Sequence, residues 1–330
     1  MKAAYITQPG PPESIIIGDL PTPEPTGDQV LVRVKAAAVN PIDTYVRSGT
    51  VKMDIPLPYI VGADLAGVVE KLGPNAKNFK VGDRVWGTDQ GLMGRQGTFA
   101  EYAAVEERWL YPIPADVSDE TAAACALVGI TAAIGLVRDA KLQAGETLFV
   151  NGGTGGVGSM VVQMAKALGA RVITTAGSDE KLKQCLEFGA DAAINYKRED
   201  VSARVKELAP GGVDVWWETI REPNFEQTVP LLARRGRMIL MAGRDARPIF
   251  PVGPFYTQDC RLLGFAMFNA TREEQDAAAA DINRWLAAGK LKPRIDRVLP
   301  LEKAAEAHRL QEDSTIGKSG ALAGKIVIKP

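Results

Sequence analysis

The fold of this chain is decided by the stretch Glu146–Ala170, which reads ETLFVNGGTGGVGSMVVQMAKALGA. Thr147–Val150 is a short apolar run typical of a buried strand, and Ser159–Leu168 has helical periodicity. The turn between them carries three glycines in the pattern G-x-G-x-x-G: Gly153, Gly155 and Gly158. Between a strand and a helix this pattern predicts a dinucleotide site, because glycine lets the backbone approach a pyrophosphate and the helix N-terminus attracts its charge. An ordinary glycine-rich turn is the alternative interpretation.

Length and composition are those of a globular protein with two domains. The chain has 330 residues and a formal net charge of −1, with no signature of nucleic-acid or membrane binding. The N-terminus lacks the apolar core of a signal peptide, and no uninterrupted apolar run reaches about 18 residues, so we expect no membrane span. A reducing, cytoplasmic location suits the three isolated cysteines, which are Cys125, Cys185 and Cys260.

The pattern changes twice along the chain. Residues 1–124 contain short alternating runs such as QVLVRVKAAAV, which predict a mostly antiparallel β region. Near Asp119 a helix entered through Ser118 begins, and a second helix follows after a break around Gly129. Within residues 125–268 the chain then alternates strands with helices from Glu146 on, about six strands in all, as a doubly wound parallel sheet requires. Residues 269–330 hold too few elements for a domain, and we expect them to complete the N-terminal region. The predicted fold class is therefore α/β.

The end of the second strand of this sheet bears on the choice of cofactor. NAD sites of this kind usually place an acid there for the ribose 2′-hydroxyl, but the strand ends Thr174-Thr175-Ala176, and Asp179 falls in the next helix, where it complements the helix dipole. A 2′-phosphate would therefore not be repelled, and three side chains are candidates to bind it: Ser178, Lys181 and Tyr196. The sequence thus favours NADPH over NADH.

Other common chemistries lack the residues that they need. His308 is the single histidine, and we expect it to pack on or near a helix surface. A zinc site would have too few ligands at plausible spacing, so no metal is expected. No G-x-S-x-G motif supports a serine hydrolase. Hydride transfer, in contrast, requires only a cofactor and an acceptor held in a water-poor cleft.

Four segments occur in an order that resembles a known family: NPIDTYVRSG (Asn40–Gly49), LPYIVGADLAGVVE (Leu57–Glu70), NGGTGGVG (Asn151–Gly158) and LKPRIDRVLPLEKAAEAHR (Leu291–Arg309). Together they resemble the zinc-independent, zeta-crystallin-like quinone oxidoreductases of the medium-chain dehydrogenase/reductase superfamily. The resemblance implies a GroES-like β-barrel catalytic domain and a Rossmann domain, with the active site in the cleft between them.

The resemblance also implies which residues form the active site. Near the nicotinamide and the substrate it places Asn40, Asp43, Tyr45 and Thr131. Around the pyrophosphate it places Gly153, Thr154, Gly155, Gly156, Val157 and Gly158. Around the adenosine 2′-phosphate it places Gly177, Ser178, Lys181 and Tyr196. Against the nicotinamide half it places two loops, with Gly243 and Arg244 in one and Ala266, Met267 and Phe268 in the other.

Some of these residues have a plainer alternative. Asn40 and Asp43 also fit a helix cap, because both residue types favour caps. Tyr45 and Phe268 also fit the role of core aromatics. Beside the cofactor, Trp216-Trp217-Glu218 departs from the plainer aliphatic strand end of the family, and the following loop, TIREP, lacks its small or amide residues.

The resemblance further implies that both metal sites of the zinc alcohol dehydrogenases are absent. Those enzymes carry Cys before the Asp of the first motif and Gly-His-Glu in the second. This chain has Asn40 and Gly62-Ala63-Asp64 there, and the third ligand position falls near Leu127. A cysteine-free loop, Gly87–Phe99, replaces the lobe that binds structural zinc.

The implied function is hydride transfer from NADPH to a quinone. The alternative enzyme is an NADPH-dependent 2-alkenal or enone reductase, which uses the same hydride geometry on a conjugated C=C bond. The alternative of another class is an RNA-binding or structural zeta-crystallin-like protein, although no basic stripe supports RNA binding. A homodimer is expected, because Leu262–Phe268, LLGFAMF, predicts an apolar edge strand that two copies can pair.

Overall fold

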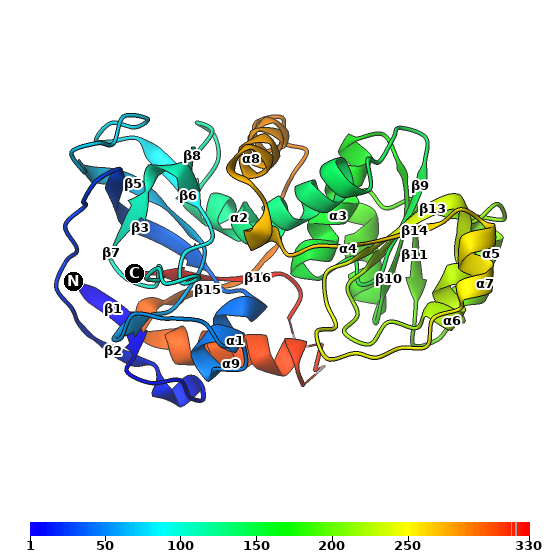
Figure 1. The fold of residues 1–330 in the computed structure, drawn as a ribbon, viewed down its shortest axis with the longest axis horizontal. Helices are drawn as coiled ribbons and strands as arrows, with labels where there is room; N and C mark the ends of the chain where they lie inside the picture. Colours follow the sequence, from blue (N-terminus) through cyan, green and yellow to red (C-terminus); the bar gives the residue numbers. More distant parts are fainter. Residues whose placement is uncertain (318, 321) are drawn as a thin grey trace. The chain divides into compact units, whose positions relative to one another are not determined.

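A computed structural model describes residues 1–317, 319–320 and 322–330. The chain forms two compact units, one of Met1–Leu127 with Pro293–Pro330 and one of Val128–Lys292 (Figure 1). The division differs from the boundaries expected at 124 and 268. Helix α8 (Arg272–Ala287) lies in the second unit, because its Glu274 pairs with Arg138 and its Ile282 side chain lies 3.1 Å from where a Cβ on Gly129 would stand.

The first unit is built on two sheets. The smaller has the order β2-β1-β4, with β1 Lys2–Ile6, β2 Ile16–Asp19 and β4 Tyr59–Ile60. The larger has the order β15-β16-β3-β5-β6-β8, with β7 also paired to β3. Its strands are β3 Gln29–Ala38, β5 Leu65–Leu72, β6 Arg84–Gly87, β7 Tyr102–Glu106, β8 Leu110–Pro112, β15 Ile295–Pro300 and β16 Lys325–Lys329. The helices α1 Pro41–Ser48 and α9 Ala304–Thr315 belong to this unit, as does the first part of α2 (Asp119–Ala133).

The last strand of the chain, β16, pairs with the C-terminal end of β3 in the larger sheet of the first unit. β16 pairs parallel with β15 and antiparallel with β3, where Val327 opposes Ala38. This pairing carries Lys325, at the start of β16, to the end of β3 and the start of α1, because the antiparallel strands run past each other there.

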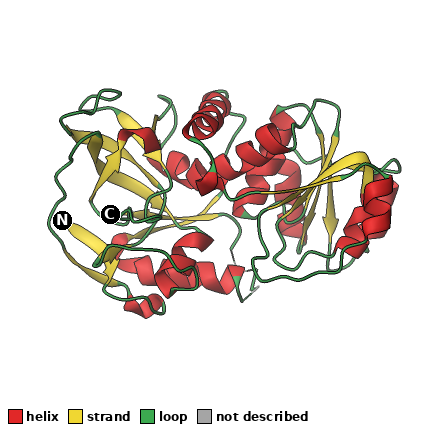
Figure 2. Cartoon of the chain, viewed as in Figure 1, coloured by secondary structure: helices red, strands yellow, loops and turns green. Residues whose placement is uncertain are grey.

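The second unit is a doubly wound parallel sheet, as the sequence predicts. Its order is β11-β10-β9-β12-β13-β14, with β9 Thr147–Val150, β10 Arg171–Ala176, β11 Ala192–Asn195, β12 Val213–Glu218, β13 Leu232–Leu240 and β14 Arg261–Gly264. Helices lie on both sides of the sheet (Figures 1 and 2). Those between β9 and β14 are α3 Gly156–Ala167, α4 Asp179–Glu187, α5 Val201–Leu208, α6 Phe225–Thr228 and α7 Val252–Thr257, whereas α8 packs on the segment Ile134–Asp139. The chain leaves β9 in one direction and reaches β12 in the other, so the strand order reverses beside the glycine-rich turn, where ligands of such sheets bind.

The helix before β9 is longer than the sequence predicts. α2 (Asp119–Ala133) passes through Gly129 without a break and continues as a π-helical segment, Ile134–Asp139. The glycine gives room to Ile282 instead of ending the helix. Asp119–Asp139 is also the one stretch of the described residues that is long and apolar enough to cross a membrane, but 78% of its most apolar window is buried, as in a core helix.

Two tryptophans of β12 fill both faces of the second unit's sheet. Trp216 stacks on Phe149 with 4.0 Å between the ring centroids. Trp217 points to the other face, where its ring lies 2.2 Å from the position that a Cβ on Gly135 would take. The core therefore accommodates both indole rings of the WWE strand end, and Glu218 is the one of these three side chains that bonds to Asn151 at the glycine-rich turn.

Candidate cofactor site and buried polar cluster

The glycines of the turn after β9 have different reasons to be glycine. A Cβ on Gly158 would lie 2.1 Å from the carbonyl oxygen of Gly152, and a Cβ on Gly153 would lie 2.3 Å from Oγ1 of Thr174. Packing within the protein therefore requires both of them. A Cβ on Gly155 would meet only the Gly152 oxygen at an ordinary 3.4 Å, and Gly155 is exposed. Packing within the protein therefore does not require glycine at position 155, whereas close approach of a ligand would.

The turn ends on a bare helix N-terminus. Gly155 is the N-cap of α3 and has no side chain with which to satisfy the first N–H groups. An anion placed there would be held by these N–H groups and by the helix dipole. Together with the open face of Gly155, this arrangement fits the pyrophosphate of a dinucleotide. The remaining predicted residues of the turn, Thr154, Gly156 and Val157, are partly buried beside it.

Side-chain and backbone oxygens of the neighbouring strands β10 and β12 hold the turn in place. Gly152 has φ +73°, and its N–H donates to Oγ1 of Thr175 at 2.9 Å. Thr175 also accepts the N–H of Gly153 on its carbonyl oxygen at 3.1 Å. From β12, the carbonyl of Trp217 accepts the N–H of Asn151 at 3.1 Å.

The predicted adenosine end lies at the ends of β10 and β11. Ser178 caps α4 by accepting the N–H of Lys181, and the Tyr196 hydroxyl lies 2.4 Å from where a Cβ on Gly177 would be. Ser178 and Tyr196 are exposed, so the structure brings the predicted residues together at one open edge. Asp179, in the first turn of α4, forms an exposed ion pair with Arg198, which partly balances its negative charge. Sequence reasoning missed Arg198; the basic pair in NYKRED was its signal.

The predicted nicotinamide residues of the second unit follow the same edge. Gly243, with φ +89°, comes after β13. Ala266 precedes a 3₁₀ turn, Met267–Asn269, beyond β14. Met267 is buried, Phe268 is partly buried and Arg244 is exposed. The last strand is thus shorter than Leu262–Phe268, the stretch that the sequence predicts. Thr131, on α2, is only 4% exposed, and its predicted role stays a prediction.

In the first unit, Asn40 and Asp43 form the cap of α1. The Asp43 carboxylate accepts the N–H of Asn40 at 2.8 Å, Pro41 takes the first helical position, and the helix ends at Gly49. Both side chains are buried, with exposures of 0% and 2%. The capping alternative therefore holds, while a role near the nicotinamide ribose stays a prediction. Tyr45 is partly buried on the same helix.

Asn40 also belongs to a buried polar cluster that no local spacing predicts. Its Nδ2 donates to Oδ2 of Asp64 at 2.7 Å. The other carboxylate oxygen of Asp64 accepts from the Thr88 hydroxyl at 2.7 Å and from the N–H of Leu127 at 3.1 Å. From β16, the ammonium of Lys325 donates to Oδ1 of Asn40 and to the carbonyl of Val39.

Burial shifts the pKa of every charged group in this cluster. Burial raises the pKa of Asp64 to about 6, against the opposing charge of Lys325. Burial and then the charge of Asp64 raise the pKa of Asp43. Burial lowers the pKa of Lys325, and the two carboxylates oppose that change. The ammonium is the cation that makes two buried carboxyl groups tolerable.

The cluster occupies the positions where the resemblance places zinc ligands, and its residues do not fit zinc. Asn40, Asp64 and Leu127 do come together, but they are joined by N–H donors, and Lys325 adds a positive charge. Within the described ranges, no three His, Cys, Asp or Glu side chains gather in a way that could hold a metal ion.

His308 is a core residue and not a surface one, so the expectation of a surface position is wrong. It is 0% exposed and meets Phe99 edge-on, with ring centroids 5.8 Å apart. Burial, and then the charge of Arg47, lower its pKa to about 3, so the imidazole is neutral at physiological pH. α9 turns this face inward, onto the first unit's core, because it packs against α1 and β16.

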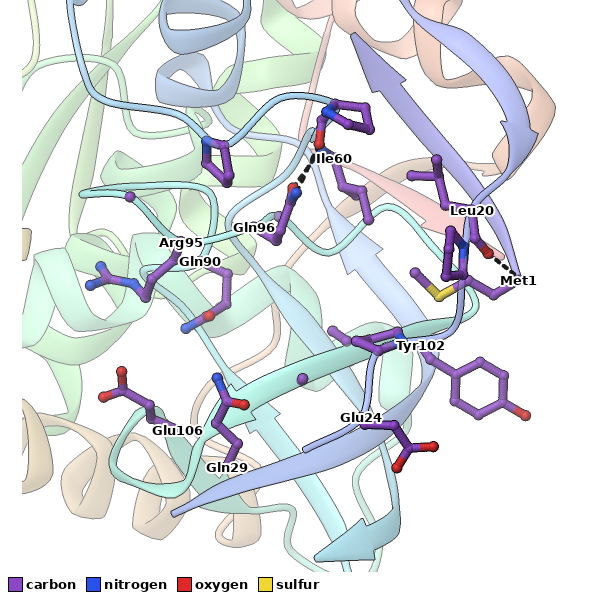
Figure 3. Close-up of a pocket in the computed structure, with 18 residues that line it drawn as sticks. Met1, Leu20, Glu24, Gln29, Ile60, Gln90, Arg95, Gln96, Tyr102 and Glu106 are labelled. Carbon is purple, nitrogen blue, oxygen red and sulfur yellow. Dashed lines mark hydrogen bonds between the residues drawn. The ribbon is translucent and has the colours of Figure 1, made fainter. Parts of the chain in front are cut away.

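A cavity of about 570 Å³ opens elsewhere in the first unit (Figure 3). Prolines and aliphatic side chains line much of it, among them Met1, Leu20 and Pro58. Gln96 closes one wall by accepting the N–H of Ile60 and donating to the carbonyl of Pro58. None of the predicted site residues is among its described lining residues, so we do not assign the reaction to it.

Known proteins with similar sequences and structures agree with this architecture. Residues 26–115 match the alcohol dehydrogenase GroES-like domain, and residues 156–283 match the zinc-binding dehydrogenase family. The human quinone oxidoreductase is 35% identical over 330 residues, which cover 99% of this chain and 97% of that protein. An NADPH-dependent alkenal/one oxidoreductase of Arabidopsis thaliana is 33% identical over 93% of this chain and 74% of its own length. The Escherichia coli quinone oxidoreductase complexed with NADPH superimposes with a TM-score of 0.86 at 29% identity, and all of both chains is covered.

Proposed function

Because this chain belongs to the quinone oxidoreductases of the medium-chain dehydrogenase/reductase superfamily, we propose that it reduces quinones with NADPH and without a metal ion. The observation that carries the proposal is the turn at Gly155, where an open glycine meets the bare N-terminus of α3 at the reversal of strand order. The residues after β10 and β11 add the preference for a 2′-phosphate.

The chain's residues bind and orient, and NADPH supplies the hydride when it is bound. The N–H groups at the start of α3 hold the pyrophosphate, and Ser178, Lys181 and Tyr196 bind the 2′-phosphate. Tyr45 orients a quinone oxygen with its phenol. A quinone that accepts hydride becomes a hydroquinone anion, which water can protonate, so no obligatory general acid is needed.

The choice of acceptor is tested by steady-state kinetics. Quinones and 2-alkenals are each compared with NADPH and with NADH. We expect the highest kcat/KM for a quinone with NADPH. A higher value for a 2-alkenal would favour the alternative function, which the 33% identity to the Arabidopsis alkenal/one oxidoreductase supports.

Replacing Lys181 with alanine should weaken NADPH binding by about 1–3 kcal/mol, the scale of a charge-assisted hydrogen bond. NADH lacks the 2′-phosphate, so its binding should hardly change. Fluorescence titration with each cofactor measures both dissociation constants. Lys183→Ala is the control, because Lys183 is exposed on the same helix. Equal losses for NADPH and NADH would contradict the assignment of Lys181.

Purified protein is expected to contain no stoichiometric zinc, because the Asn40–Asp64–Lys325 cluster offers a cation and N–H donors where a metal would need lone pairs. Elemental analysis measures the metal content, and activity after dialysis against a chelator measures its importance. About one zinc per chain, lost together with activity, would refute the metal-free reaction.

A homodimer and a cytoplasmic location complete the proposal. β14 is the last strand of the second unit's sheet, and its Leu262 is 39% exposed, so two copies could pair there about a two-fold axis. Light scattering at micromolar concentration should give twice the chain mass.

An RNA-binding role is checked by filter binding with and without NADPH, and we expect that the filter retains no RNA.

A further inference from the structure

The last residue of β12, Glu218, is a buried carboxylate surrounded by N–H donors. Its side chain is 2% exposed. It accepts from Nδ2 of Asn151 at 3.1 and 3.2 Å, from Nε1 of Trp216 at 3.1 Å and from the N–H of Ile220 at 2.8 Å. Burial raises the pKa of the Glu218 carboxyl, and these uncharged donors oppose that rise because they favour the ionised form. Glu218 is the acceptor in every one of these contacts.

Asn151 connects this carboxylate to the glycine-rich turn. Its amide nitrogen faces Glu218, so its amide oxygen, Oδ1, must face the other way, where it accepts from the Thr175 hydroxyl at 3.2 Å. The same hydroxyl accepts the N–H of Gly152 at 2.9 Å. The result is a continuous chain of hydrogen bonds from Glu218 to the first glycine of the turn, and all its donors point toward the carboxylate.

The position of Gly152 in turn sets the start of α3. Its carbonyl oxygen occupies the space that leaves Gly158 no room for a Cβ, at 2.1 Å. A second contact secures the same segment, since the Thr219 hydroxyl donates to the carbonyl of Asn151 at 2.7 Å. Any rotation of the Asn151 amide would therefore be felt where the helix N–H groups meet a phosphate.

We infer that Glu218 is a positioning residue of the cofactor site: it fixes the orientation of the Asn151 amide and, through Thr175, the geometry of the turn that binds the pyrophosphate. This inference rests on the proposed function, because it assumes that the turn binds NADPH. Glu218, a buried side chain behind the turn, thereby controls the affinity of the turn for the pyrophosphate of NADPH.

Glu218→Gln is the sharpest test, because it keeps the size of the side chain and replaces one acceptor oxygen with a donor. In either orientation, the new NH2 group faces a donor that the carboxylate accepted, the Trp216 indole or the N–H of Ile220, so residue 218 shifts and holds the Asn151 amide less firmly. We expect the Kd for NADPH to rise about tenfold, the scale of a lost hydrogen bond to a charged group. kcat at saturating NADPH should stay within about twofold, because only binding geometry is affected.

Adenosine 2′-phosphate separates this effect from general damage. It lacks the pyrophosphate, so its Kd should be the same for Glu218→Gln and the wild type. Glu226→Gln is the matched control, since Glu226 is exposed on α6 and in the same segment. Wild-type protein that binds no NADPH would refute the proposed function. If the Glu218→Gln variant is folded and binds NADPH as tightly as the wild type does, the role of Glu218 is refuted.

Thr175→Val provides a second route to the same test. It removes the hydroxyl that links Asn151 to Gly152 and preserves the shape of the side chain. If one chain of hydrogen bonds carries the effect, the double variant Glu218→Gln/Thr175→Val should lose no more NADPH affinity than the weaker-binding single variant. Fully additive losses would show that Glu218 acts independently of Thr175, and would overturn the inference.

Discussion

Gly158→Ala should destabilise the second unit and strongly weaken NADPH binding. The new Cβ would lie 2.1 Å from the Gly152 oxygen and 3.0 Å from its carbonyl carbon. Both are backbone atoms, so relief requires the turn or α3 to move. We expect a loss of about 3 kcal/mol in the free energy of unfolding, the upper range for overpacking. Loss of about two charge-assisted hydrogen bonds to phosphate should raise the Kd for NADPH roughly a hundredfold.

Gly155→Ala is the matched comparison and should behave differently. Its Cβ meets the Gly152 oxygen at 3.4 Å, and its φ of −68° suits alanine. The free energy of unfolding should therefore change by less than about 0.5 kcal/mol. NADPH binding should still weaken at least about tenfold, because the methyl group stands where the pyrophosphate approaches. Denaturant unfolding and fluorescence titration of both variants measure the two effects. Unchanged NADPH affinity in Gly155→Ala would contradict the site.

Lys325→Met should strongly destabilise the first unit at neutral and alkaline pH. The substitution leaves Asp43 and Asp64 buried without the ammonium whose charge lowers their pKa values. Removing the countercharge of buried carboxyl groups typically costs about 3–5 kcal/mol. Lys329→Met is the control on the same strand, since Lys329 is 52% exposed and its pair with Glu120 should contribute at most about 1 kcal/mol.

The loss of stability in Lys325→Met should depend on pH. Burial raises the pKa of Asp64 to about 6 and that of Asp43 to about 8, so each carboxyl group contributes stability when protonated and loses it as the pH rises through these values. The charge of Lys325 lowers both pKa values; without it, ionisation becomes costlier. The deficit of Lys325→Met relative to wild type should therefore grow between pH 5 and 8. Denaturant unfolding across this range measures it, and a deficit independent of pH would refute the coupling.

Local patterns predicted the second unit well. The strand, the three spaced glycines and the periodic helix of Glu146–Ala170 lie next to one another in the chain, so spacing alone indicates the turn and its exposed helix N-terminus. That β10 ends in Thr174-Thr175-Ala176, without an acid at the strand end, is an equally local observation. Gly129 shows the limit of such patterns, because a glycine inside a helix fits both a break and close packing, and only the position of Ile282 decides between them.

Contacts between distant segments were decided by the tertiary structure. Lys325 meets Asn40 across 285 residues of sequence, and Asp64 joins them from a third segment. Glu218 reaches Asn151 across 67 residues. The helical pattern around His308 fits a surface position as well as a core position, and only the packing of α9 on α1 and β16 shows that His308 is buried. The sequence by itself thus determined the sheet and the cofactor turn, whose signals are periodic and contiguous. Only the fold decided the buried charges, because their partners are chosen by burial and strand pairing, which leave no spacing in the chain.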